Sequence, residues 1–135
     1  MDYETFDHEA DMGVRGFGKT LEEAFENGAK AMSSIMVDLN TVKPEVMKEI
    51  ECEADDPEAL FVTWLNQIRA LLDIEGMVFS EFKVKIHGNY LKGWVKGEVL
   101  DHKRHGLGED VKAATYHLLK IEKNDQYMVQ CIVDL

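Results

Sequence analysis

The sequence predicts a compact α+β domain, mostly antiparallel sheet packed with two main helices, that spans residues 1–135. Two stretches repeat apolar residues at the spacing of an amphipathic helix. Most other apolar stretches alternate with polar residues, as strands with one face in water do. A chain of 135 residues is long enough for one core and too short to divide between two.

The first third of the chain predicts a hairpin followed by a helix. Strands are expected at residues 3–7 and 12–18, joined by a short turn. The helix should begin at Thr20, because Thr20 and Glu23 have the spacing of a capping box, in which each side chain satisfies a free backbone N–H. Its apolar residues continue at helical spacing to about Val37.

A second helix is expected after a strand at residues 46–54. Asp56 is a favoured N-cap residue, and Pro57 suits the first helical position, where its missing N–H would have no partner. Gly76 can end this helix in a left-handed conformation. The remaining strands are expected at residues 79–86, 90–100, 112–122 and 127–133.

The formal net charge of −11 limits the partners of the protein. Binding of a phosphate backbone depends on Lys and Arg, so tight direct binding of nucleic acid is not expected. The same charge suits binding of divalent cations or of a basic partner protein. We expect no membrane partner, because no apolar run approaches the roughly 20 residues that span a bilayer.

The two cysteines and the N-terminus indicate a cytoplasmic protein. Cys52 and Cys131 lie far apart in strand-like stretches, which suits reduced core thiols better than a disulfide or a zinc site. The first residues have no basic stretch followed by an apolar one, so they do not resemble a signal peptide.

Two acidic segments are candidate metal-binding groups. Asp7, His8, Glu9 and Asp11 crowd into one predicted turn, and carboxylate oxygens suit hard cations such as calcium. One short turn cannot complete such a site, and Asp in a turn also commonly bonds to the backbone. Asp134 stands next to the carboxylate of Leu135, where two negative groups need either solvent or a shared cation.

The stretch at residues 101–110 is a polar, glycine-containing loop that we expect at the surface. His102 and His105 could form a pair of metal ligands, but no third ligand follows at metal-binding spacing. His117 lies further along the chain. The sequence contains no phosphate-binding glycine loop, nucleophile elbow or zinc motif. It therefore offers no self-sufficient catalytic apparatus.

Five segments in order resemble the archease family. They are Asp7-His8-Glu9-Ala10-Asp11, the helix start at residues 18–25, residues 75–79, residues 110–117 and the ending Ile132-Val133-Asp134-Leu135. The first matches the family's Asp-His-x-Ala-Asp signature, and together the five span the whole chain. Glu9 stands where many relatives have Thr, and Asp110 stands where many have Glu.

The resemblance implies a compact α+β domain that binds a divalent cation, expected to be calcium, through Asp11 and Asp134. The Leu135 carboxylate is a further implied ligand, and Asp7 and His8 are implied supporting groups. Lys112 is an implied contact for the partner. That partner is an RtcB-type RNA ligase, which the protein would help to acquire guanylate from GTP and to turn over repeatedly in tRNA splicing or RNA repair.

The resemblance thus favours a protein cofactor that is not an enzyme. Two other functions stay open on the sequence. One is a metal-dependent hydrolase that uses Asp7, His8 and Asp11, which would require their turn and the loop of His102 and His105 to form one pocket. The other is a chaperone-like binding module with no metal function.

Overall fold

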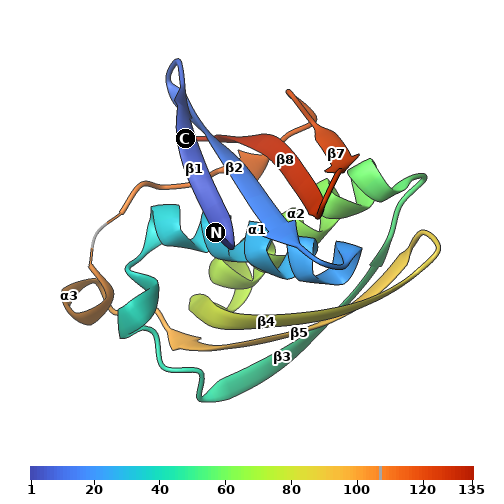
Figure 1. Cartoon of the computed structure of the whole chain (residues 1–135). Helices are drawn as coiled ribbons and strands as arrows, with labels where there is room; N and C mark the ends of the chain where they lie inside the picture. The colour runs from blue at the N-terminus through green and yellow to red at the C-terminus, as the bar shows by residue number, and fades with distance from the viewer. Residues whose placement is uncertain (107) are drawn as a thin grey trace.

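The chain forms three layers, with two helices lying between two antiparallel sheets (Figure 1). The computed structural model describes residues 1–106 and 108–135. This arrangement confirms the predicted α+β class and its two main helices. The elements in chain order are β1 (Tyr3–His8), β2 (Asp11–Gly18), α1 (Leu21–Met36), the 3-10 helix η1 (Leu39–Thr41), β3 (Val46–Glu53), α2 (Pro57–Glu75), β4 (Met77–His87), β5 (Tyr90–Val99), α3 (His102–His105), β6 (Ala113–Ala114), β7 (Lys120–Lys123) and β8 (Tyr127–Asp134).

The five-stranded sheet is built around the strand that comes last in the sequence. Its order is β1-β2-β8-β6, and β7 also pairs with β8. Met12 pairs with Val133, and Gly18 pairs with Tyr127. Because β8 runs antiparallel to β2, the end of β8 returns to the start of β2, and the C-terminus lies beside the β1–β2 hairpin (Figure 1).

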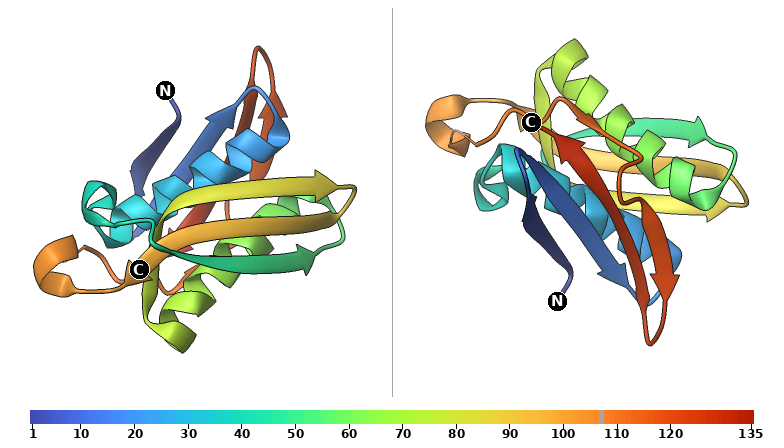
Figure 2. Two further views of the ribbon diagram at one scale, coloured as in Figure 1. Left: turned by 90° about the horizontal axis from the view of Figure 1, so that it is seen from below. Right: turned by 90° about the horizontal axis from the view of Figure 1, so that it is seen from above.

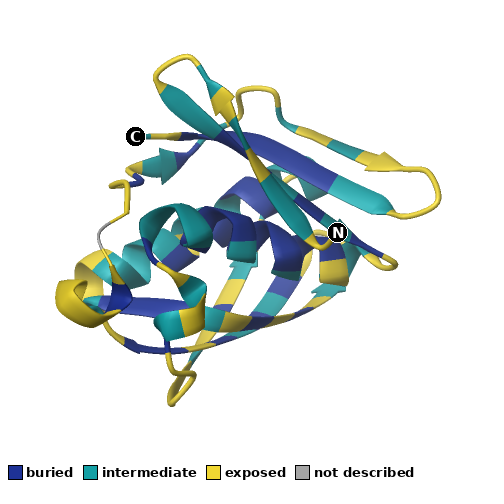
Figure 3. Ribbon diagram, turned by 60° about the vertical axis from the view of Figure 1, so that its left-hand side comes forward, coloured by how far each residue is buried: buried dark blue, intermediate teal, exposed yellow. Residues whose placement is uncertain are grey.

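The three-stranded sheet has the order β3-β5-β4 and covers the other side of the helices (Figure 2). Its strands alternate between buried and exposed residues, so one face packs on the helices and the other faces solvent (Figure 3). Trp64 of α2 packs edge-on against Phe82 of this sheet, with ring centroids 6.5 Å apart.

Both main helices start as the sequence predicts. The Glu23 N–H donates to Thr20 Oγ1 at 3.1 Å, and the Ala59 N–H donates to Asp56 Oδ1 at 2.7 Å. Gly76 ends α2 with a φ of 67°, the left-handed conformation that glycine adopts readily. None of the helices in the described residues is both long and apolar enough to cross a lipid bilayer.

The core lies where the two helices meet. The rings of Phe25 and Phe61 are 5.2 Å apart, and Trp64 donates its indole N–H to the carbonyl of Phe25 at 3.0 Å. These three side chains are fully buried. Both cysteines are free, as expected, with Cys131 buried and Cys52 half-buried.

One strand prediction is wrong. Residues 112–122 do not form a continuous strand, because β6 ends at Ala114 and β7 begins only at Lys120. Between them, Leu118 has a φ of 51° and Leu119 donates its N–H to the Tyr116 carbonyl at 3.3 Å, so a turn interrupts the strand. Apolar residues on both sides of the turn gave the stretch its strand-like appearance.

The expectation of a polar surface loop at residues 101–110 is also partly wrong. Residues 102–105 form the single helical turn α3, and His105 is completely buried. Residue 107 lies outside the described residues. Exposed His102 does follow the expectation.

Candidate functional site

The candidate site lies at the end of the five-stranded sheet where β2 begins and β8 ends. Met12 pairs with Val133, so the next position outward sets Asp11 opposite Asp134. Directly opposite residues of an antiparallel pair point to the same face, with Cβ atoms about 5 Å apart. The Leu135 N–H also donates to Asp11 Oδ1 at 3.1 Å. Two segments more than 120 residues apart in the sequence thereby meet.

His8 and Asp7 occupy different positions relative to this pair of carboxylates. His8 is the last residue of β1 and pairs directly with Asp11 across the hairpin, whereas Asp7 pairs with Met12. Because successive side chains of a strand point to opposite faces, His8 shares the face of Asp11 and Asp7 does not. Glu9 follows at the hairpin turn with a φ of 56°.

His117 also belongs to this end of the sheet, which the sequence did not indicate. Its imidazole lies edge-on against His8, with ring centroids 4.9 Å apart. Its carbonyl accepts a hydrogen bond from the Ile132 N–H at 3.1 Å, which fixes this loop to β8. No pattern in the sequence links residues 8 and 117, since the contact depends on the pairing of β8 with β2 on one side and with β6 and β7 on the other.

The predicted partner contact Lys112 lies next to the same carboxylates. Its N–H donates to the Asp134 carbonyl at 2.8 Å, and its side chain is exposed. Helix α2 holds this segment in place. Asn66 exchanges two hydrogen bonds with the backbone of Ala114, at 2.8 and 3.1 Å, and Arg69 donates to the carbonyl of Val111.

The side chains at this end are of the type that binds a hard divalent cation, but there are too few of them to complete its coordination. Asp11 and Asp134 supply carboxylate oxygens, the ligands that calcium and magnesium prefer. Within residues 1–106 and 108–135, no three His, Cys, Asp or Glu side chains are arranged to hold a metal ion. A cation here would need further oxygen ligands from the chain terminus, from water or from a partner, since calcium takes about six to eight.

The hydrolase hypothesis required the turn at Asp7–Asp11 and the loop of His102 and His105 to converge, and they do not. Helix α3 lies far from the tip of the β1–β2 hairpin (Figure 1). His105 is instead bound to Glu98, with Nε2 and Oε2 2.8 Å apart, and its Nδ1 accepts from the Asp101 N–H at 3.0 Å. This pattern assigns the proton to Nε2 and makes His105 a structural residue.

Glu98 is the centre of a cluster of hydrogen bonds that includes buried His105 and exposed Arg104. Arg104 donates to both of its carboxylate oxygens, at 2.7 and 2.8 Å, and the Lys43 N–H donates at 2.7 Å. The bonds from Arg104, then from Lys43 and His105, hold the pKa of Glu98 well below its usual range. The cluster ties α3 to β5 and to the segment before β3, away from the candidate site.

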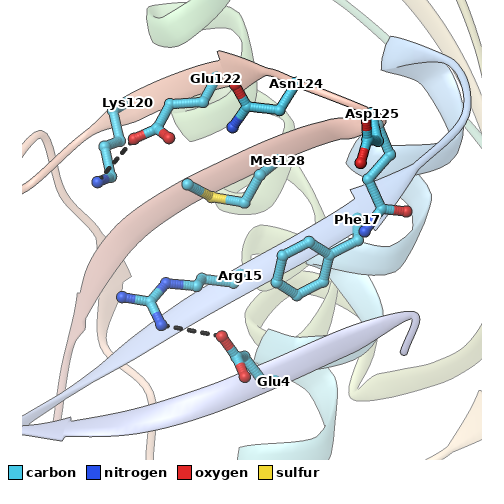
Figure 4. A pocket seen from close by; sticks show the side chains of 9 residues that line it. Glu4, Arg15, Phe17, Lys120, Glu122, Asn124, Asp125 and Met128 are labelled. Atoms are coloured by element: carbon cyan, nitrogen blue, oxygen red, sulfur yellow. Dashed lines mark hydrogen bonds and ion pairs between the residues drawn. The ribbon is translucent and has the colours of Figure 1, made fainter.

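A pocket of about 430 Å³ lies further along the five-stranded sheet, between β1 and β7 (Figure 4). Arg15 lines this pocket and donates to Glu4 at 2.9 Å and to Gln130 at 2.6 Å. Its guanidinium also lies 4.2 Å from the ring centroid of Phe6. These contacts give the arginine a structural role, because they join β1, β2 and β8.

Comparisons with known proteins agree on one family. The model described as "Archease protein family (MTH1598/TM1083)" matches residues 3–135. Relatives called protein archease from Thermococcus gammatolerans and Pyrococcus abyssi are 44% and 42% identical, and each match covers 98% of both chains. A solution structure of protein 1598 from Methanobacterium thermoautotrophicum superposes with a TM-score of 0.86 at 35% identity, over 98% of both chains.

Proposed function

The chain belongs to the archease family, and from this premise we propose that it is an activator of an RtcB-type, GTP-dependent RNA ligase. It would promote guanylylation of the ligase and allow multiple turnover in tRNA splicing or RNA repair. In this role the protein is a cofactor of an enzyme and has no catalytic residues of its own. We place this activity in the cytoplasm.

The observation that carries the proposal is the meeting of Asp11 with the end of β8. The Asp11–Leu135 hydrogen bond and the β2–β8 register bring Asp11 and Asp134 to one exposed end of the sheet. Lys112 lies beside them on a segment that Asn66 and Arg69 hold. An acidic end with one flanking lysine has charges that complement a ligase pocket containing metal ions and phosphate groups.

We propose that Asp11 and Asp134 hold a divalent cation, calcium being the first candidate, with the Leu135 carboxylate as a third ligand. When bound, the cation would neutralise the repulsion between the carboxylates and polarise phosphate oxygens. Because the side chains supply few ligands, the remaining positions would be open to water or to groups of the ligase. His8 is the better placed of the two supporting residues, since it shares the face of Asp11.

RNA ligation with limiting ligase tests this function. The assay contains an RtcB-type ligase from the same organism, GTP, excess RNA and the wild-type protein, Asp11→Asn or Asp134→Asn, and it counts turnovers per ligase. The wild type should give many turnovers, and each variant should lower the number at least tenfold. Lys112→Ala should raise the concentration of the protein that is needed for half-maximal activation of the ligase.

Asp55→Asn is the matched control, because it removes one exposed carboxylate at the other end of the molecule. Calcium titration followed by calorimetry gives a second readout that needs no ligase. Full stimulation by both Asp variants would favour the alternative function, a chaperone-like binding module with no metal function. No stimulation by the wild type would contradict the activator role itself.

A further inference from the structure

The outer face of β4 and β5 concentrates positive charge in a strongly acidic protein. Four of the 15 Lys and Arg residues lie on these two paired strands and on the same face, while the chain as a whole has 26 acidic residues. The four are Lys83, Lys85, Lys92 and Lys96. Alternate residues of the same strands, such as Val84 and Val95, are buried against the helices. Figure 2 looks directly onto this face in its left-hand view.

The lysines are placed against one another in a way that costs stability. Lys85 lies directly opposite Lys92 in the β4–β5 register, and like charges at such positions repel. Lys92 is 3.8 Å from Glu51, a long and exposed ion pair. In the part of the chain that the structure describes, Lys83, Lys85 and Lys96 have no carboxylate within 4.0 Å. An anionic ligand would relieve this repulsion.

Aromatic side chains lie among these lysines. Trp94 pairs with Lys83 across the strands and is half-exposed, and Tyr90 is 37% exposed at the start of β5. A shallow pocket of about 280 Å³ lies beside the indole, and its lining includes Lys83, Lys96 and Glu81. Flat rings beside lysines are the combination that binds nucleobases and phosphates of a single strand.

Acidic residues limit where such a strand could run. Glu49, Glu51 and Glu53 occupy the same face of β3, at one edge of this sheet. Glu49 accepts the indole N–H of Trp94 at 3.1 Å, which orients the ring. A phosphate backbone would therefore follow β4, where Lys83 and Lys85 lie about 7 Å apart, and avoid the β3 edge.

We propose that the outer face of β4 and β5 is a binding site for single-stranded nucleic acid, with phosphates on Lys83, Lys85 and Lys96 and a base against Trp94. The net charge of the protein opposes binding of any polyanion, so the interaction is weak and depends strongly on salt. It becomes significant where a partner already holds the strand nearby, because proximity raises the effective concentration. The site is separate from the acidic end formed by Asp11 and Asp134.

The fluorescence of Trp94 provides a direct test on the isolated protein. The chain has two tryptophans, and Trp64 is fully buried, so quenching by an added ligand reports on the β4–β5 face. Titration with a uridine decamer in about 20 mM salt should quench Trp94 in a saturable way. With about three phosphate contacts, raising the salt to about 100 mM should weaken binding by about 30-fold.

Lys83→Gln with Lys85→Gln is the test variant, and Lys120→Gln with Lys123→Gln removes the same charge from the other sheet as its control. The first pair should weaken binding at least tenfold, and the second should leave it unchanged. The proposal is overturned if wild-type fluorescence does not respond, or if the two double variants bind equally. It also fails if a glutamate decapeptide quenches as strongly as the uridine decamer, since the face would then take acidic protein segments.

Discussion

The Asp11 carboxylate accepts the backbone N–H of Leu135 at 3.1 Å, so the first residue of β2 holds the end of β8. This contact gives Asp11 a structural role in addition to the proposed cation binding. The two roles use different properties of the side chain. The hydrogen bond needs one acceptor oxygen, whereas the cation needs the negative charge.

Asp11→Ala and Asp11→Asn should therefore separate stability from cation binding. We expect Asp11→Ala to lower the free energy of unfolding by about 1 kcal/mol, the value of one partly exposed hydrogen bond. Asp11→Asn keeps an acceptor oxygen and should change stability much less while still losing calcium affinity. Urea denaturation measures the first quantity and calorimetry the second, with exposed Asp55→Ala as the control. Equal stability of Asp11→Ala and wild type would show that the hydrogen bond contributes nothing.

Asn66→Ala should make the segment that carries Lys112 less firmly held against α2. It removes both hydrogen bonds to the Ala114 backbone, and leaving partly buried groups without partners costs about 1–3 kcal/mol. Hydrogen exchange should accelerate at Ala114 and at neighbouring amides of β6. Exposed Gln67, the next residue of α2, gives the control Gln67→Ala. If Asn66→Ala left exchange unchanged, the β6–β8 pairing alone would be holding the segment.

Two glycine substitutions should differ sharply in cost. A Cβ at Gly97 would lie 1.8 Å from the Val78 carbonyl oxygen, which cannot move without disturbing β4, so Gly97→Ala should cost about 3 kcal/mol or more. A Cβ at Gly88 meets no atom within 4 Å, and only its φ of 61° disfavours a side chain, which costs about 1 kcal/mol. Thermal unfolding of both variants compares them. Similar melting temperatures would contradict the close approach of β4 and β5 at Gly97.

Glu98 should make the protein sensitive to acid. Arg104 is the main cause of its lowered pKa, so the carboxylate binds protons more weakly in the folded state than in the unfolded chain. Its contribution to stability is then fully present above the unfolded pKa of about 4.3 and is lost as pH falls below that value. Glu98→Gln should be less stable than wild type at pH 7, and the difference should shrink in acid.

Urea unfolding across the acid range measures that difference, with exposed Glu53→Gln as the control. A gap between wild type and Glu98→Gln that stays constant from neutral to acidic pH would contradict the ion-pair explanation. A similar pH-dependent gap for Glu53→Gln would show a general charge effect instead.

Both thiols should resist modification while the protein is folded. Burial raises the pKa of Cys52 to about 11 and that of Cys131 to about 12. At pH 8 the reactive thiolate of Cys52 is therefore only about a thousandth of the total. An aromatic disulfide reagent should react with neither cysteine until urea unfolds the chain, and Cys52 should react faster as pH approaches 11. Rapid reaction of one thiol per chain at pH 8 would disprove this.

The helices and most strands were predictable because their signals are local. Thr20, Asp56 and Gly76 mark helix ends by interactions within a few residues, and the structure confirms each one. The break between β6 and β7 was not predictable in this way. Leu118 adopts a left-handed conformation that its own side chain disfavours, so the surrounding structure must impose it.

The candidate site shows the same division between local and distant information. The acidic turn was visible in the sequence, but its meeting with Asp134 came from the family resemblance and not from any spacing. The His8–His117 contact joins residues 109 positions apart, and only the strand order of the sheet creates it. His105 looked like a surface residue because its neighbours are polar, while its partner Glu98 lies on another element.

The central place of β8 has a consequence during synthesis on the ribosome. About 120 residues are synthesised between Met12 and its partner Val133. At a synthesis rate of about 5–20 residues per second, β2 is without that neighbour for about 6–24 s. The α2 helix and the β3-β5-β4 sheet can form in that interval, since all their residues precede β8. The nascent chain would then carry one completed sheet and one open edge, and a chaperone that binds extended strands would find its target on β2.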